Sequence, residues 1–104
     1  MALQFMMIGR YSRTAANEVA QSGMGAARQA WAELIASPPM NGRVDAWYAV
    51  DDHEWDVVIL GQVDNDDPAY WAKTQLVKGR ASGRFEATRL LRLVSAEEFD
   101  QTDL

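Results

Sequence analysis

The side chains best suited to acid–base chemistry lie in one charged segment near the middle of the chain, Asp51–Asp56. It contains His53, the single histidine of the sequence, with carboxylates on both sides. Neighbouring carboxylates favour the charged form of an imidazole, so His53 is a candidate general acid or base. The alternative is a solvated histidine in an exposed turn.

Asp56 is the second catalytic candidate, because it stands directly before the apolar run Val57–Leu60. A carboxylate on a half-buried sheet face needs a partner. Arg10, Arg84 or Arg92 could supply the opposite charge. We predict that Asp56 anchors the polar part of a ligand or takes part in catalysis; the alternative is a structural ion pair.

Trp47 is the candidate for stacking on an aromatic ligand, with Asp45 two residues before it. The alternative for Trp47 is packing in a subunit interface, where aromatic residues are enriched. The complete set of predicted ligand-binding residues is Arg10, Asp45, Trp47, Asp56 and Arg92.

The acidic segment Asp64–Asp67 could suggest a calcium loop. An EF-hand needs glycine at the sixth position and glutamate at the twelfth, where this chain has Ala69 and Gln75. A solvated loop that caps the following helix explains the acids better. There is no cysteine, which excludes disulfides and thiolate metal sites. We predict no metal site and no cofactor.

Length and charge limit the remaining classes of function. A chain of 104 residues fits one domain, 1–104. The net charge is −5 without a basic cluster, which argues against nucleic acid and against an anionic membrane as partners. The N-terminal apolar run Phe5–Ile8 is too short for a signal peptide or a membrane span, so a cytoplasmic protein is expected.

The hydrophobic pattern predicts strands and helices in the order strand, helix, strand, strand, helix, strand. Alternation predicts the strands Leu3–Arg10, Arg43–Val50, Trp55–Val63 and Arg84–Val94. Spacing and caps predict the helices Gly25–Ala36 and Pro68–Lys78, a shorter helical piece Ala15–Ala20, and a terminal turn Ser95–Phe99 anchored by Phe99. The order predicts an α+β, ferredoxin-like fold, in which two helices cover one face of a four-stranded antiparallel sheet.

Both faces of the predicted sheet carry apolar residues. The set expected to pack on the helices is Leu3, Phe5, Met7, Val44, Ala46, Tyr48, Val50, Phe85, Leu91 and Leu93. The opposite set is Met6, Ile8, Trp47, Ala49, Val58, Leu60 and Leu90. Exposed apolar surface on this scale indicates an interface or a ligand site. We predict a homodimer with the two sheets facing each other; the alternative is a monomer with scattered surface apolar residues.

The element order and three short segments resemble the GYD domain family, small proteins of the dimeric α/β-barrel superfamily. The segments are Glu54–Val58, Gly83–Arg89 and Glu97–Phe99, and the resemblance extends from Met7 to Phe99. It implies a ferredoxin-like domain that dimerises as an α/β barrel.

The central motif of that family is Gly, any residue, Tyr, Asp. Here His53 stands in place of the glycine and Trp55 in place of the tyrosine, while Asp56 is kept.

Three classes of function remain. The first is a protein that binds a small apolar or aromatic molecule without catalysis. The second is a cofactor-independent oxygenase, cyclase or isomerase acting on an aromatic or polyketide-like substrate, by analogy with the wider superfamily. The third is a haem-binding protein, which is disfavoured because the only histidine lies in an acidic turn.

Overall fold

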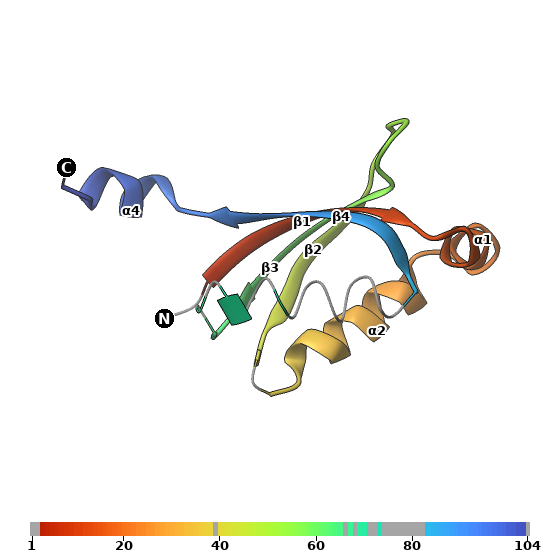
Figure 1. Cartoon of the computed structure of the whole chain (residues 1–104), viewed down its shortest axis with the longest axis horizontal. Helices are drawn as coiled ribbons and strands as arrows, with labels where there is room; N and C mark the ends of the chain where they lie inside the picture. The colour runs from red at the N-terminus through yellow and green to blue at the C-terminus, as the bar shows by residue number, and fades with distance from the viewer. Residues whose placement is uncertain are drawn as a thin grey trace.

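A four-stranded antiparallel sheet organises the chain, with the strand order β2-β3-β1-β4 (Figure 1). The computed structural model describes residues 3–38, 40–65, 67, 69–70, 73 and 83–103. The strands are β1 (Leu3–Tyr11), β2 (Arg43–Ala49), β3 (Val57–Val63) and β4 (Phe85–Leu93). This arrangement confirms the predicted α+β, ferredoxin-like fold.

Three helices are described: α1 (Arg13–Ser22), α2 (Gly25–Ala36) and α4 (Ala96–Gln101). The bounds of α2 are those predicted from its spacing, and α1 is longer than the helical piece expected there. The predicted helix Pro68–Lys78 lies largely outside the described residues. None of the helices in the described part of the chain has the length and apolar character needed to cross a membrane.

The core lies between the sheet and the helices α1 and α2. Alternate residues of β1 and β3 are buried along their whole length, because successive side chains of a strand point to opposite faces. The buried core consists of Leu3, Phe5, Met7, Tyr11, Trp31, Ile35, Met40, Val57, Ile59, Val63 and Phe85. Trp31 of α2 is 7% exposed and belongs to this core.

A register shift in β2 reverses the predicted faces of that strand from Ala46 onward, while Val44 lies on the helix side as predicted. Between Val44 and Ala46 the pairing with β3 skips a residue, so Trp47 pairs with the buried Ile59. Cross-strand partners share a face, and an extra residue turns every following side chain to the other side. The prediction that Trp47 faces away from the helices is therefore wrong: Trp47 packs on the core.

The pairing of β4 with β1 also changes the faces that were predicted for residues of β4. Leu90 pairs with the buried Met7 and contacts the core, whereas Leu91 pairs with Met6 on the opposite face. The register shifts between Arg10 and Tyr11, which returns Phe85 to the core side as predicted. Ala46, Tyr48, Leu91 and Leu93 were expected on the helix side and lie opposite; Ala49 and Leu90 were expected opposite and lie on the helix side.

The sheet face turned away from α1 and α2 is apolar at its centre. We call it the open face, and its central residues are Met6, Ile8, Ala46, Val58, Leu60 and Leu91. These side chains are partly exposed, and Tyr48 on the same face is 58% exposed. Figure 1 shows that none of the described helices covers this face.

The C-terminal segment extends beyond the end of the sheet, where α4 projects from the body of the molecule (Figure 1). We call residues 94–103 the C-terminal arm. Phe99, which was predicted to anchor this segment, is 74% exposed. That prediction is wrong, because the arm leads away from the core instead of folding back onto it.

Candidate functional site

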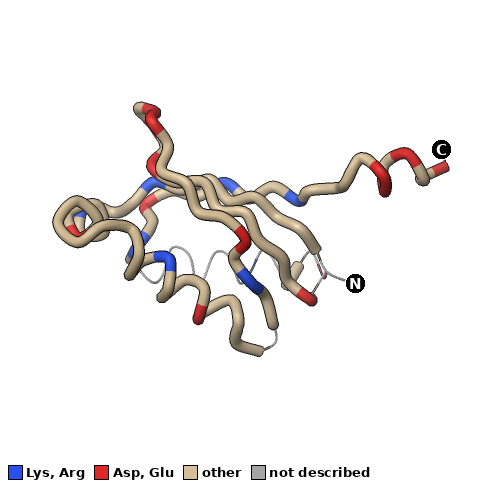
Figure 2. The backbone as a smooth tube through the Cα atoms, turned by 180° about the vertical axis from the view of Figure 1, so that it is seen from behind, with Lys and Arg blue, Asp and Glu red and all other residues tan. Residues whose placement is uncertain are grey.

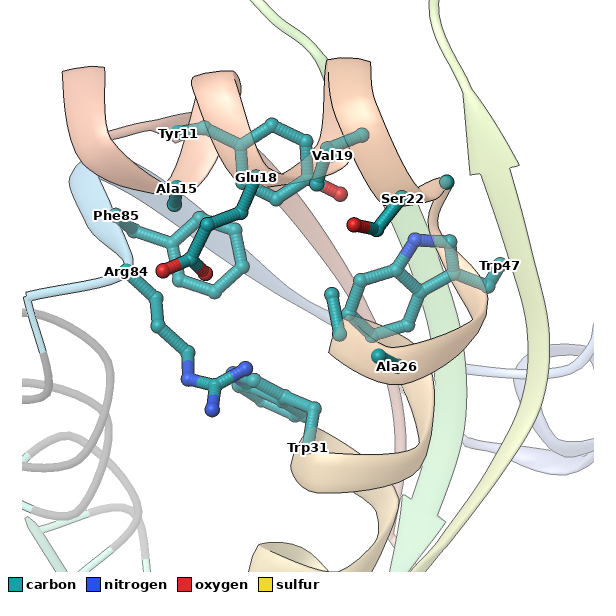
Figure 3. A pocket seen from close by; sticks show the side chains of 12 residues that line it. Tyr11, Ala15, Glu18, Val19, Ser22, Ala26, Trp31, Trp47, Arg84 and Phe85 are labelled. Carbon is teal, nitrogen blue, oxygen red and sulfur yellow. The ribbon is translucent and has the colours of Figure 1, made fainter.

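A cavity of about 240 Å³ opens between α1, α2 and the sheet (Figure 3). Its walls are Ala15, Glu18, Val19, Ser22, Gly23, Ala26 and Ala27 from the helical side, and Tyr11, Trp31, Trp47, Arg84 and Phe85 around them. This volume lies just below the range of about 300–1,000 Å³ that is typical of small-molecule sites, so the cavity suits only a small ligand.

Local sequence places the helical wall. Ser12 caps α1 by accepting a hydrogen bond from the Ala15 N–H, at 3.2 Å, and its own N–H donates to the Arg84 carbonyl at 2.8 Å. The cavity side of α1 therefore presents residues three and four apart, from Ala15 to Ser22. Gly23, at φ 82°, ends α1 in a conformation that favours glycine. The turn brings α2 against the same space.

Four aromatic rings form the inner wall. Tyr11 and Phe85 stack with ring centroids 5.5 Å apart. Trp31 meets Trp47 and Phe85 edge-on, at 6.5 and 6.4 Å. These are favourable aromatic geometries, and they make the wall largely apolar. The small side chains of Ala26 and Ala27 leave the space in front of it open.

Three buried polar groups on this wall lack a hydrogen-bond partner within the described part of the chain. They are the Tyr11 hydroxyl and the indole Nε1–H groups of Trp31 and Trp47. An unsatisfied buried polar group costs about 1–3 kcal/mol, and most such groups in native proteins are satisfied by protein or water. Each of the three atoms is almost fully enclosed by its neighbours, so an occupant of the cavity that supplies hydrogen-bond acceptors would remove this cost only after the side chains around them shift.

Burial raises the pKa of the Tyr11 phenol above 10.0, since the phenolate is poorly solvated there. The nearby Trp47 indole N–H opposes this effect and the Asp56 carboxylate adds to it. Trp47 and Tyr11 are thus neighbours, although their geometry does not make a hydrogen bond. The phenol stays protonated at neutral pH and can donate as well as accept.

The rim of the cavity carries one charge of each sign. Glu18 from α1 and Arg84 before β4 are both exposed and both line the opening (Figure 3). Opposite charges at the rim leave little net field along the entrance. The site therefore suits a neutral ligand better than a highly charged one.

Of the ligand-binding residues predicted from the sequence, Trp47 alone lines this cavity. Asp45 is exposed, and its carboxylate pairs with Arg43 at 2.8 Å. Arg10 lies 2.6 Å from Glu86 in an ion pair whose Nε–H is not aligned for a hydrogen bond. Arg92 is exposed on the edge strand β4. The structure does not bring these charged residues together.

His53 lies in the exposed turn between β2 and β3, and does not line the cavity. Figure 2 shows the acids of this turn at the opposite end of the molecule from those of the C-terminal arm. This position fits the alternative interpretation of His53, a solvated histidine in an exposed turn. Within the described residues, no cluster of three or more His, Asp or Glu side chains is arranged to hold a metal ion.

Asp56 has a structural role that links this turn to the cavity. Its Oδ2 accepts a hydrogen bond from the Tyr11 N–H at 2.8 Å, its N–H donates to the Gly9 carbonyl, and its carbonyl accepts from the Val50 N–H. The partner of the carboxylate is thus a backbone amide and not the arginine that was expected. Asp56 fixes the end of β1 where Tyr11 enters the aromatic wall, so it is a positioning residue.

We expect Asp56→Ala to lower the free energy of unfolding by about 1–3 kcal/mol, because a partly buried N–H loses a charged acceptor. Asp56→Asn is the matched control, since its amide oxygen can still accept from Tyr11 and should retain most of the stability. Urea denaturation of both variants measures this. Equal losses in the two variants would show that the charge matters and the hydrogen bond does not.

Tyr11 and the inward face of α1 were not among the residues predicted from the sequence. The spacing of small and apolar residues in α1, from Ala15 to Val19 and Ser22, was a usable signal for a helix that lines a cavity. The inward position of Trp47 had no such signal, because a bulge sets it.

Comparison with known proteins supports the fold. No model of a known protein family matches the chain, and no curated protein matches its sequence. Among solved structures, the crystal structure of FFRP-DM1 superimposes with a TM-score of 0.51 at 15% sequence identity, covering 88% of this chain and 99% of that one. What the two proteins share at this identity is the fold.

Proposed function

We propose that this protein binds a small, neutral aromatic molecule that carries hydrogen-bond acceptors, in the cavity between α1, α2 and the sheet. The observation that carries the proposal is the set of three buried, unpartnered polar groups on an otherwise apolar wall, from Tyr11, Trp31 and Trp47. Ligand sites combine an apolar lining with a few convergent polar groups in this way.

The chemistry of the three groups defines the ligand class. An indole N–H can only donate, so the two tryptophans need acceptors, whereas a phenol can do either. Aromatic rings on the wall favour a flat ring system that lies against them. Carbonyl or ether oxygens on a fused aromatic ring meet both conditions.

Two probes with the same carbon skeleton test the class of ligand: menadione, a naphthoquinone with two carbonyl oxygens, and 2-methylnaphthalene, which has none. Isothermal titration calorimetry should show tighter binding of menadione by about tenfold or more, since each satisfied buried donor is worth about 1 kcal/mol. Equal affinities would show that the polar groups do not contribute. If neither probe binds, the proposal of a ligand site in this cavity is wrong.

Trp47→Phe should weaken menadione binding by about tenfold, because it keeps an aromatic ring but removes the indole donor. The affinity for 2-methylnaphthalene should stay nearly unchanged. Trp55→Phe is the matched control: Trp55 is a half-buried tryptophan that does not line the cavity. A similar loss in both variants would point to a general effect on stability instead of a contact with the ligand.

The other two functional classes receive no support from the site. Catalysis was expected to depend on His53 and Asp56, and neither lines the cavity. Haem would need an axial ligand, and the only histidine is in the exposed turn. Binding without chemistry is the function favoured by the described residues.

We also propose that the protein forms a homodimer through the open face. Support comes from the run of apolar side chains at the centre of that face, which the described helices leave uncovered. Contiguous exposed apolar surface of this kind marks association sites.

We propose as well that the protein is a member of the GYD family and that it is cytoplasmic. Asp56, the residue shared with the family motif, has a structural role that would explain its presence there.

A further inference from the structure

We propose that the C-terminal arm of each chain docks on the open face of a second copy, with Phe99 as its anchor. This inference rests on the proposed homodimer and names the element that completes it. The arm is exchanged between two copies, so each open face receives the arm of the other chain.

The first observation is the exposure of the arm. Val94 is 55% exposed and Phe99 is 74% exposed, and α4 buries none of its residues. Figure 1 shows the arm leading away from the sheet, and none of the described strands or other helices lies against α4. A phenylalanine held in water on a projecting helix is costly, and this cost disappears when another surface covers it.

The second observation is that α4 carries its own capping residues. Ser95 caps α4 by accepting a hydrogen bond from the Glu98 N–H at 3.1 Å, and Glu97 and Glu98 lie in the first turn. A helix of six residues is marginal in water when it packs on nothing. A local sequence that shapes an isolated helix in this way suits an element that packs on another molecule.

The third observation is charge complementarity. Glu97, Glu98, Asp100 and Asp103 make the arm acidic, without a single Lys or Arg between residues 94 and 103. The open face carries Arg89, which pairs with Ile8 across the strands and makes no ion pair with any other described residue. An acidic arm with an apolar anchor thus matches an apolar face with a cation at its edge.

A photoreactive phenylalanine analogue at position 99 tests the contact directly. A mixture of ¹⁴N- and ¹⁵N-labelled chains, irradiated and digested, should give cross-linked peptides that join the two labels and map to β1, β3 or β4. Cross-links confined to one label would show that the arm folds back on its own chain. Cross-linking no greater than that of the same analogue at position 54, in the exposed turn, would also overturn the proposal.

Sedimentation of Phe99→Ala provides the second test. The dimer dissociation constant should rise by at least about tenfold, because a large aromatic anchor contributes at least that much at an interface. Glu98→Lys should weaken the dimer and Arg89→Glu in the same chain should restore part of it, while Asp51→Lys in the distant turn should have little effect. A wild-type dimer that Phe99→Ala leaves unchanged would overturn the arm alone. A wild-type monomer would overturn both the arm and the dimer, and would leave the ligand site untouched.

Discussion

Replacing Gly61 by alanine is expected to lower the free energy of unfolding by about 3 kcal/mol, at the upper end of what overpacking costs. Gly61 lies in β3 between Phe5 of β1 and Val44 of β2. A Cβ atom added there would lie 2.5 Å from the Arg43 carbonyl oxygen and 2.7 Å from the Phe5 ring. Backbone atoms of a paired strand cannot move aside cheaply, so the sheet would have to open.

Gly25→Ala is the matched control for this prediction. Gly25 begins α2, and an added Cβ atom meets nothing within 4 Å. The change should be neutral or stabilise the protein by up to ~1 kcal/mol, because alanine is the better helix former. Urea denaturation of both variants should therefore give opposite signs. A Gly61→Ala protein as stable as the wild type would show that Phe5 is loosely packed, which would contradict its complete burial.

Leu60→Asp is expected to convert the proposed dimer to a monomer, with a rise of at least about a hundredfold in the dissociation constant. Leu60 lies in the interior strand β3 at the centre of the open face, where its cross-strand partners are Met6 and Ala46. Neither partner can pair with a carboxylate. The interface would bury one such charge from each chain, and this should weaken the dimer by about 3 kcal/mol or more.

Gln4→Asp is the control for Leu60→Asp, since it places the same charge on the same face at an exposed, polar position. Its dissociation constant should change little. Sedimentation measures both variants, and circular dichroism shows that the monomer keeps its fold. If the protein with Leu60→Asp remains a dimer of wild-type strength, the copies associate through another surface, and the open face must have a different role.

The binding and association proposals can be tested separately because they involve opposite sides of the sheet. The cavity is on the side of α1 and α2, whereas Leu60 faces away from both helices. Leu60→Asp should therefore leave menadione binding unchanged, and Trp47→Phe should leave the dimer unchanged. Either cross effect would indicate that the two faces are coupled through the sheet.

The sequence by itself determined the elements described here and their order. Alternation in the predicted strands Leu3–Arg10 and Trp55–Val63, and three- and four-residue spacing in Gly25–Ala36, are local patterns that each segment carries alone. Because the order of such segments allows few antiparallel arrangements, the ferredoxin-like fold followed. The apolar residues of β1 and β3 on the open face could be identified for the same reason.

Tertiary structure alone decided which residues meet. The bulge before Ala46 turned Trp47 from the open face to the core, and a bulge depends on the pairing of two strands, which no single segment encodes. The Asp56 carboxylate accepts a hydrogen bond from the Tyr11 N–H, 45 residues away, and does not pair with an arginine as expected. The cavity needs the turn at Gly23 to bring two helices against one aromatic wall. Such contacts between distant segments are invisible to periodicity, because periodicity reports only the face of an element and never its neighbour.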